Sequence, residues 1–206
     1  DITMFMSDMS LNENLSSTPQ DRRELMDLVE RMQNAFTTIA KSKVPTIALA
    51  HGFCIGGATS LVSACDIRLA TKDAKFSIGE TKLGLVADVG VIQRMPKIVS
   101  SGDMNELALT GRIFDGEHAE RIRFVSKAYD NSDELFEAGE KLADEISSNS
   151  KRIVQATKQA LEKSANLTVD QGLEYAKLWS TSFLISEDLR EGVMAFLEKR
   201  DPKFNE

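Results

Sequence analysis

The chain has 206 residues, of which 42% are hydrophobic, and its 32 acidic and 25 basic side chains give a formal net charge of −7. This length suits one ordinary domain with a full apolar core. The acidic balance argues against nucleic acid or an anionic membrane as the main partner, and no apolar run approaches the roughly 18 residues of a membrane span. Cys54 and Cys65 are too few for a disulfide framework and suit a reducing compartment.

The first 45 residues contain a polar segment followed by an amphipathic helix. Residues 7–20 are rich in Ser, Asn and Thr, which predicts a loop. Residues 21–42 predict a helix because apolar residues recur at spacings of three and four along one face. These apolar positions are Leu25, Leu28, Met32, Ala35, Phe36 and Ile39. Pro45 then favours an extended segment.

Residues 45–95 carry the most informative pattern in the chain. The short apolar run at 46–50 predicts a strand buried on both faces. The glycine pair Gly56-Gly57 follows, and residues 59–65 predict a helix. Glycines between a strand and a helix let the backbone approach a ligand closely. The first N–H groups of such a helix are free to bind an anion, or an oxyanion that develops on a carbonyl.

Two carboxylates follow this glycine pair. Residues 66–70 and 75–78 predict two further extended pieces, after which Glu80 and Asp88 stand eight residues apart. A carboxylate can take up or deliver a proton beside a backbone cradle that holds an oxyanion. The sequence therefore predicts a site made of one backbone cradle and two acids in loops. The alternative for Asp88 is a structural one, in which it caps the helix that starts at Val89-Gly90.

From residue 132 onward the chain is predicted to be helical. Residues 134–147 and 153–163 each predict a helix. Thr168 and Gln171 predict a capping box for a third helix that runs to about residue 184, and Ser186 is the expected N-cap of the last helix. Five large apolar residues in the last two helices are expected in the core or against another subunit: Trp179, Phe183, Val193, Phe196 and Leu197.

The chain resembles the crotonase, or enoyl-CoA hydratase/isomerase, superfamily in four separated segments: HGFCIGG (51–57), CDIRLA (65–70), FSIGETKLGLVADVG (76–90) and SEDLREGVMAFLEKRDPKF (186–204). The segments occur in the family's order and cover the supplied chain, but not the whole family domain. The resemblance implies an α/β fold, a crotonase-type spiral of ββα turns with a helical C-terminal trimerisation region. It implies a spiral core over residues 1–130, without its N-terminal strands, and a helical oligomerisation region over residues 131–206.

The resemblance also implies roles for individual residues. Glu80 and Asp88 match catalytic positions, and Gly57 matches one N–H donor of the family's oxyanion hole. The second donor belongs to a family segment whose tail resembles Asp1-Ile2. Substrate-binding positions match Gly56, Ser60 and Lys199. Lys199 would reach the CoA phosphate of a neighbouring subunit, and the alternative is that it is an ordinary surface lysine.

Three activities are compatible with this pattern. Hydratases of the family use two glutamates, and the first of those positions is Ser60 here. Δ3,Δ2-enoyl-CoA isomerases use a single carboxylate at the Glu80 position. Δ3,5,Δ2,4-dienoyl-CoA isomerases pair it with an aspartate at the Asp88 position, and they normally also carry an aspartate where this chain has Ser60. The resemblance therefore favours an acyl-CoA double-bond isomerase of fatty acid metabolism. The alternatives are an enoyl-CoA hydratase, which is a lyase, and a catalytically impaired crotonase-like binding protein.

The same resemblance implies the partners of the chain. The substrate is expected to be an acyl-CoA thioester, with no metal and no cofactor, since CoA is part of the substrate. The assembly is expected to be a homotrimer or a dimer of trimers, with neither nucleic acid nor membrane as a partner. The expected compartment is the cytoplasm or the mitochondrial matrix.

Overall fold

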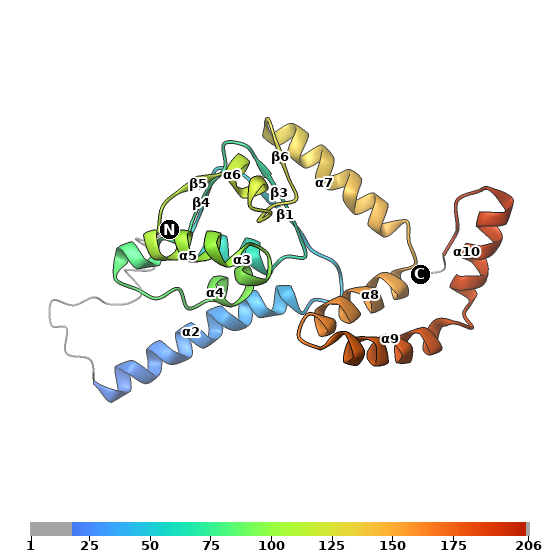
Figure 1. Cartoon of the computed structure of the whole chain (residues 1–206), viewed down its shortest axis with the longest axis horizontal. Helices are drawn as coiled ribbons and strands as arrows, with labels where there is room; N and C mark the ends of the chain where they lie inside the picture. Colours follow the sequence, from blue (N-terminus) through green and yellow to red (C-terminus); the bar gives the residue numbers. More distant parts are fainter. Residues whose placement is uncertain (1–17, 205–206) are drawn as a thin grey trace.

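The computed structural model describes residues 18–204. The predictions for Asp1-Ile2 and for most of the polar loop at 7–20 lie outside the described residues. The described chain forms two small sheets with helices around them, and three C-terminal helices extend from this core as an arm (Figure 1).

Helix α2 (Pro19–Ala40) is the amphipathic helix that the apolar spacing predicts. It begins with a capping box, in which the Thr18 hydroxyl accepts a hydrogen bond from the Asp21 N–H and the Asp21 carboxylate accepts one from the Thr18 N–H. The helix packs against α3 (Gly57–Ala64) and lies along one side of the core (Figure 1). None of its residues is fully buried by the described chain.

The first sheet contains three parallel strands in the order β1-β3-β6. Their bounds are β1 (Ile47–Ala50), β3 (Ile67–Thr71) and β6 (Lys127–Tyr129). The run at 46–50 is therefore a strand, as predicted. Its burial was predicted wrongly, because only Ala50 is fully buried. β1 is an edge strand, with β3 on one side and no described strand on the other.

The second sheet has the order β2-β4-β5. Its strands are β2 (Phe53–Ile55), β4 (Lys75–Ser77) and β5 (Phe114–Asp115), with β2 and β4 parallel and β5 antiparallel to β4. Each of the first two spiral turns gives one strand to each sheet and then passes into helices. These are the predicted ββα turns. The sequence analysis did not predict β2.

Short helices complete the spiral core. They are α3, η1 (Gly79–Leu83), α4 (Val91–Arg94), η2 (Met95–Lys97), α5 (Ser101–Thr110) and α6 (Gly116–Arg121). Gly111 ends α5 in the left-handed conformation, with φ 58°, which favours glycine at this position. Between these helices and the sheets lies an aromatic cluster, in which the Phe76 ring stacks on Phe114 and meets Phe124 edge-on. All three side chains are buried.

Four helices follow the spiral: α7 (Ser132–Ser147), α8 (Lys151–Ser164), α9 (Val169–Phe183) and α10 (Glu187–Glu198). Helix α7 packs on all three strands of the first sheet. Its Gly139 lies against Leu49, whose methyl groups would be 2.7 Å from a Cβ at that position. The predicted capping box of Thr168 with Gln171 and the predicted N-cap at Ser186 are both confirmed. The division at residue 130 stays a prediction.

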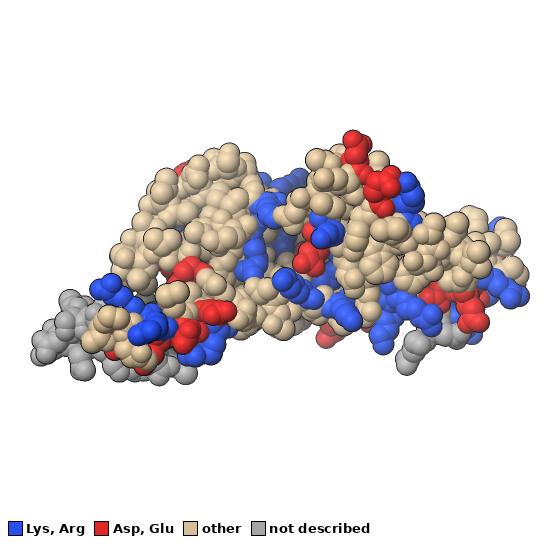
Figure 2. Space-filling model, turned by 90° about the horizontal axis from the view of Figure 1, so that it is seen from below, with Lys and Arg blue, Asp and Glu red and all other residues tan. Residues whose placement is uncertain are grey.

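Helices α8–α10 form the arm, and polar contacts attach it. The Lys158 ammonium of α8 donates to Asp66 Oδ2 at 2.6 Å and to the Val44 carbonyl at 3.1 Å, which joins the arm to the core. The Ser150 hydroxyl donates to Asp188 Oδ2 at 2.6 Å, which joins α8 to α10. A largely apolar groove of about 1470 Å³ lies between the core and the arm. Figure 2 shows this hollow from below, with basic residues around it.

Candidate active site

The glycine cradle lies where β2 passes into α3. Gly56 has φ 56°, a left-handed conformation that favours glycine, and its N–H donates to the Ser77 carbonyl at 2.9 Å. The buried Thr59 hydroxyl lies within hydrogen-bond distance of the carbonyls of Ser77 and Cys54. These contacts join the ends of β2 and β4 to the first turn of α3, so the cradle is held by both strands.

Gly57 is the first residue of α3 and is exposed. As the first residue of a helix, it has no carbonyl within that helix to accept a hydrogen bond from its N–H. A Cβ at this position would meet no atom within 4 Å, so the space beside the backbone is open. The helix N-terminus carries a partial positive charge. This backbone can therefore receive an anionic oxygen.

Glu80 lies beside this cradle. It is the second residue of the short 3₁₀ helix η1, and not in a loop as predicted. A Cβ on Gly56 would be 3.4 Å from Glu80 Oε1, so the carboxylate lies directly against the glycine. The other oxygen, Oε2, is buried and has no hydrogen-bond partner among the described residues. An unpartnered buried carboxylate oxygen is costly in a folded protein and is a feature of functional sites.

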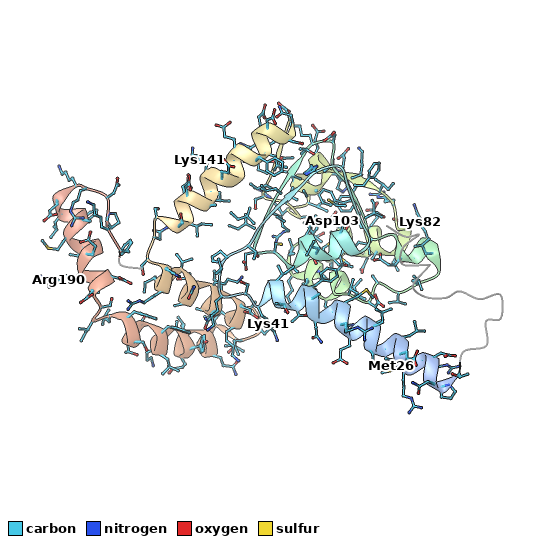
Figure 3. All side chains as sticks on the ribbon, turned by 180° about the vertical axis from the view of Figure 1, so that it is seen from behind. Met26, Lys41, Lys82, Asp103, Lys141 and Arg190 are labelled. Carbon is cyan, nitrogen blue, oxygen red and sulfur yellow. The ribbon has the colours of Figure 1, made fainter. Side chains whose placement is uncertain are left out.

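Contacts with α5 hold the Glu80 segment in place. The Thr81 hydroxyl donates to the Ala108 carbonyl at 2.7 Å, and the Ser77 hydroxyl donates to the Gly111 carbonyl at 3.0 Å. The Glu80 carbonyl itself accepts the Leu85 N–H at 3.0 Å. Figure 3 labels Lys82 in the same segment, at the end of the molecule opposite Arg190 of α10. The backbone on both sides of Glu80 is therefore fixed by the packed core.

Ser60 lies one helical turn beyond Gly56, and its N–H donates to the Gly56 carbonyl at 3.0 Å. Residues four apart share one face of a helix, so Ser60 lies on the same side of α3 as Gly56, which contacts Glu80. The Ser60 side chain is fully buried, and its hydroxyl has no hydrogen-bond partner among the described residues. The structure thus brings Glu80 to the glycine pair at the start of α3, with Ser60 one turn further along the same helix.

Asp88 lies in the irregular segment between η1 and α4, and its side chain is exposed. Its neighbours Ala87 and Val89 are both buried. The alternative prediction that Asp88 caps the next helix is wrong, because the N-cap of α4 is Gly90 and no side chain caps it. Across residues 18–204, no hydrogen bond or ion pair involves the Asp88 carboxylate. Its backbone carbonyl accepts a hydrogen bond from Gln33 Nε2 at 2.7 Å.

Within the single chain, Lys199 lies away from the glycine cradle and Glu80. It is the C-cap of α10, in the left-handed conformation with φ 55°, and it is exposed. Figure 1 shows α10 at the far end of the arm, away from α3.

Among residues 18–204, no cluster of His, Cys, Asp and Glu is arranged to hold a metal ion. In the same range, no helix combines the length and the apolar character that crossing a membrane requires.

Two cysteines and one histidine lie near the cradle in the sequence. Cys54 and Cys65 are free thiols, as expected, and burial raises the pKa of both, so they stay protonated. The exposed His51 ring meets Phe136 of α7 edge-on at 5.9 Å. Sequence reasoning missed Gln33, because a single glutamine on an amphipathic helix carries no signal of the loop that it contacts.

Comparisons with known proteins agree with this arrangement. A sequence model described as enoyl-CoA hydratase/isomerase matches residues 4–206. The chain is 47% identical over 188 residues to a mitochondrial Delta(3,5)-Delta(2,4)-dienoyl-CoA isomerase of Dictyostelium discoideum, covering 91% of this chain and 64% of that protein. It is 42% identical over 193 residues to a peroxisomal protein of the same name from Arabidopsis thaliana, covering 92% of this chain and 69% of that protein.

Solved structures agree on the fold. A crystal structure of an enoyl-CoA hydratase from Bacillus anthracis superposes with a TM-score of 0.83 at 27% identity, covering 94% of this chain and 74% of that chain. The predicted crotonase-type fold is therefore confirmed. The chain spans just under two thirds of the length of its Dictyostelium relative.

Proposed function

The chain belongs to the enoyl-CoA hydratase/isomerase family, and we propose that the full-length protein shifts double bonds in acyl-CoA thioesters, with Glu80 as its main acid and base. One observation carries this proposal: the Glu80 carboxylate lies against Gly56, at the N-terminal end of α3, with an unpartnered buried oxygen. A proton-transferring carboxylate beside a backbone that can hold an oxyanion is what enolate chemistry requires.

The chemistry starts from the acidity of a carbon next to the thioester carbonyl. When a proton leaves carbon 2, negative charge moves to the carbonyl oxygen. In this proposal the Gly57 N–H donates a hydrogen bond to that oxygen. Removing one donor of this kind typically costs about 2.7–4 kcal/mol of transition-state stabilisation. The second donor of the family lies outside the described residues. Proton transfer moves no electrons to an acceptor, so we expect no cofactor and no metal.

Asp88 extends the proposal to a conjugated substrate. In a 3,5-dienoyl-CoA, the C2–H bond breaks, the double bonds move to positions 2 and 4, and a proton adds to carbon 6. One carboxylate takes the first proton and the other supplies the second, so Glu80 and Asp88 would act at opposite ends of the diene. Support comes from the similarity to two proteins named Delta(3,5)-Delta(2,4)-dienoyl-CoA isomerase. The exposed apolar residues between the acids, Leu83, Leu85 and Val86, would contact the acyl chain.

A hydratase is the second candidate, because the similar Bacillus anthracis structure carries that name. Hydration requires one group to activate water and another to deliver a proton. At the position of the family's other glutamate this chain carries Ser60, whose hydroxyl is a poor base without an adjacent activating base. That hydroxyl has no hydrogen-bond partner among the described residues. The site therefore favours isomerisation over hydration.

The test is kcat/KM on one preparation of the full-length protein with three substrates: a 3,5-dienoyl-CoA, a 3-enoyl-CoA and a 2-enoyl-CoA. We expect double-bond shifts in the first two to be faster than hydration of the third. Hydration that is faster by tenfold or more would overturn the isomerase proposal. Calorimetric binding of an acyl-CoA without turnover of any substrate would instead identify a catalytically impaired binding protein.

We also propose that the protein assembles as a homotrimer or a dimer of trimers. The last two helices expose many apolar side chains in the single chain: Val169, Leu173, Leu178, Leu184, Leu189, Val193, Phe196 and Leu197. A closed interface would bury them. Lys199 would then reach the CoA phosphate at a neighbouring subunit's site, since α10 lies far from α3 in its own chain. The compartment stays a prediction, because the two relatives are named mitochondrial and peroxisomal.

Light scattering at micromolar concentration measures this assembly. Phe196→Asp, at a side chain that is 82% exposed in the single chain, is expected to reduce the trimer to monomers. Leu109→Asp, at a similarly exposed site on the spiral core, is the matched control and is expected to leave the assembly intact. A wild-type protein that is monomeric at this concentration would contradict the proposal.

A further inference from the structure

The segment that carries Asp88 has no regular structure of its own. Residues 85–89 form neither helix nor strand, and no backbone N–H of the described residues donates to their carbonyls. Backbone carbonyls in such a segment need other partners. The carbonyls of Asp88 and Val89 accept hydrogen bonds from side chains instead. Gln33 Nε2 donates to the Asp88 carbonyl at 2.7 Å, and Arg94 Nη1 donates to the Val89 carbonyl at 3.2 Å.

Both of these contacts lead to helix α2. Gln33 is a residue of α2, and the Arg94 guanidinium also donates from Nη2 to the hydroxyl of Thr37, another residue of α2, at 3.1 Å. Gln33 and Thr37 are four residues apart and therefore lie on one face of the helix. That face is thus connected to two successive carbonyls of the Asp88 segment, one directly and one through Arg94.

Gly90 makes the second contact possible. Its φ of 113° lies in the region that favours glycine, and a Cβ there would be 1.8 Å from Arg94 Nη1. The guanidinium therefore occupies the space that any other side chain at position 90 would fill. Asp88 itself has buried neighbours on both sides, Ala87 and Val89. These neighbours hold its Cα from the core, and Gln33 of α2 and Arg94 of α4 hold the carbonyls of residues 88 and 89.

We propose that Gln33 is a positioning residue, which with Arg94 holds Asp88 where a conjugated substrate needs its second acid. The inference rests on the proposed function and adds to it: α2 determines how well the protein handles dienoyl rather than monoenoyl substrates. The segment around Glu80 is held by α5, and among residues 18–204 no hydrogen bond joins it to Gln33, so the two acids are positioned by different helices. Loss of the Gln33 contact therefore impairs Asp88 alone.

The test is Gln33→Met in the full-length protein, which keeps the length of the side chain and removes its donor. We expect kcat for a 3,5-dienoyl-CoA to fall about tenfold with KM within twofold, because misplacing a reacting group by 1 Å can cost about 10²-fold. Turnover of a 3-enoyl-CoA stays within twofold. Gln33→Lys, which restores a donor of similar reach, recovers most of the lost rate. Gln93→Met, the same change at an exposed glutamine of α4, is the matched control with no effect.

A double-mutant cycle shows whether Gln33 acts through Asp88. In an Asp88→Asn background, Gln33→Met is expected to change the dienoyl rate by less than twofold. An equal loss on both substrates, or a full tenfold loss in the Asp88→Asn background, would overturn the inference. The proposed function is tested separately: it fails if Glu80→Gln retains turnover, whereas this inference fails if Asp88→Asn lowers the dienoyl rate and Gln33→Met does not.

Discussion

The two acidic segments of the site differ in how the fold holds them. Glu80 stands in a 3₁₀ turn that follows directly from β4, and its carboxylate lies against Gly56 with Oε2 buried. Asp88 stands in an irregular segment, with an exposed side chain and a backbone held by side chains from α2 and α4. One acid is positioned by the packed core and the other by a few hydrogen bonds near the surface.

This difference indicates that the two carboxylates have different roles. A carboxylate in a site that excludes water interacts strongly with charge that develops in a reaction, because the local dielectric constant is low. A carboxylate exposed to water exchanges protons with solvent and depends more on accurate placement. We therefore expect every substrate to need Glu80, whereas only a substrate with two separated proton-transfer positions needs Asp88. The following predictions test this comparison, from the largest expected effect to the smallest.

Glu80→Gln is expected to have the largest effect. It removes the group that transfers the proton while keeping the shape of the side chain, so kcat for both dienoyl-CoA and 3-enoyl-CoA falls roughly 10²–10⁴-fold. The affinity for acyl-CoA, measured by isothermal titration, changes little because the amide is nearly isosteric. Turnover within threefold of wild type would show that Glu80 is not the acid/base.

Asp88→Asn separates the two acids. The dienoyl rate is expected to fall about 10²-fold, at the low end for a general acid or base, because water at an exposed site can deliver a proton in its place. The 3-enoyl rate is expected to stay within threefold. Steady-state kinetics with the two substrates provide the measurement. Equal losses on both would mean that the two acids are not divided in this way.

Gly90→Ala disturbs the Asp88 segment without touching either acid. The added Cβ would overlap Arg94 Nη1, and the alanine would have to keep a φ of 113°. Such backbone strain lowers the free energy of unfolding by about 1–3 kcal/mol. Urea unfolding measures this loss, and the dienoyl rate is expected to fall more than the 3-enoyl rate. Gly102→Ala is the control, because its Cβ would meet only the Ser100 hydroxyl, at 3.7 Å, in the first turn of α5. Unchanged stability of Gly90→Ala would disprove the role of this glycine.

Ser60→Ala is expected to have the smallest effect. The serine hydroxyl is buried without a hydrogen-bond partner, so its removal is neutral or stabilises the fold by up to about 1 kcal/mol. Isomerase rates should remain within threefold. Ser60→Glu is the informative counterpart, because it supplies the acid that hydratases of the family carry and is expected to raise hydration of 2-enoyl-CoA. A loss of isomerase activity beyond tenfold in Ser60→Ala would show that the hydroxyl takes part in the reaction.

Much of the candidate site was predictable from the sequence. The glycine pair before a helix predicted the cradle, and the resemblance to the crotonase superfamily implied that Glu80 belongs to the same site. The position of Asp88 was less predictable. The sequence allowed either a catalytic residue or a helix cap, and the cap was excluded only when the structure placed Gly90 at the start of α4. The strand β2 was missed because three residues are too short for a pattern of period two to stand out.

The sequence by itself determined the local elements and the residue types of the site, because helix caps, apolar spacing and glycine pairs act over a few neighbouring residues. Thr168 and Ser186 illustrate this, since each begins the helix where its pattern predicts. Tertiary structure alone decided which distant residues meet. Gln33 lies 55 residues from Asp88, and no local pattern links them. Contacts across such separations depend on how whole elements pack, and for this reason only the folded chain shows that Gln33 of α2 donates to the Asp88 carbonyl.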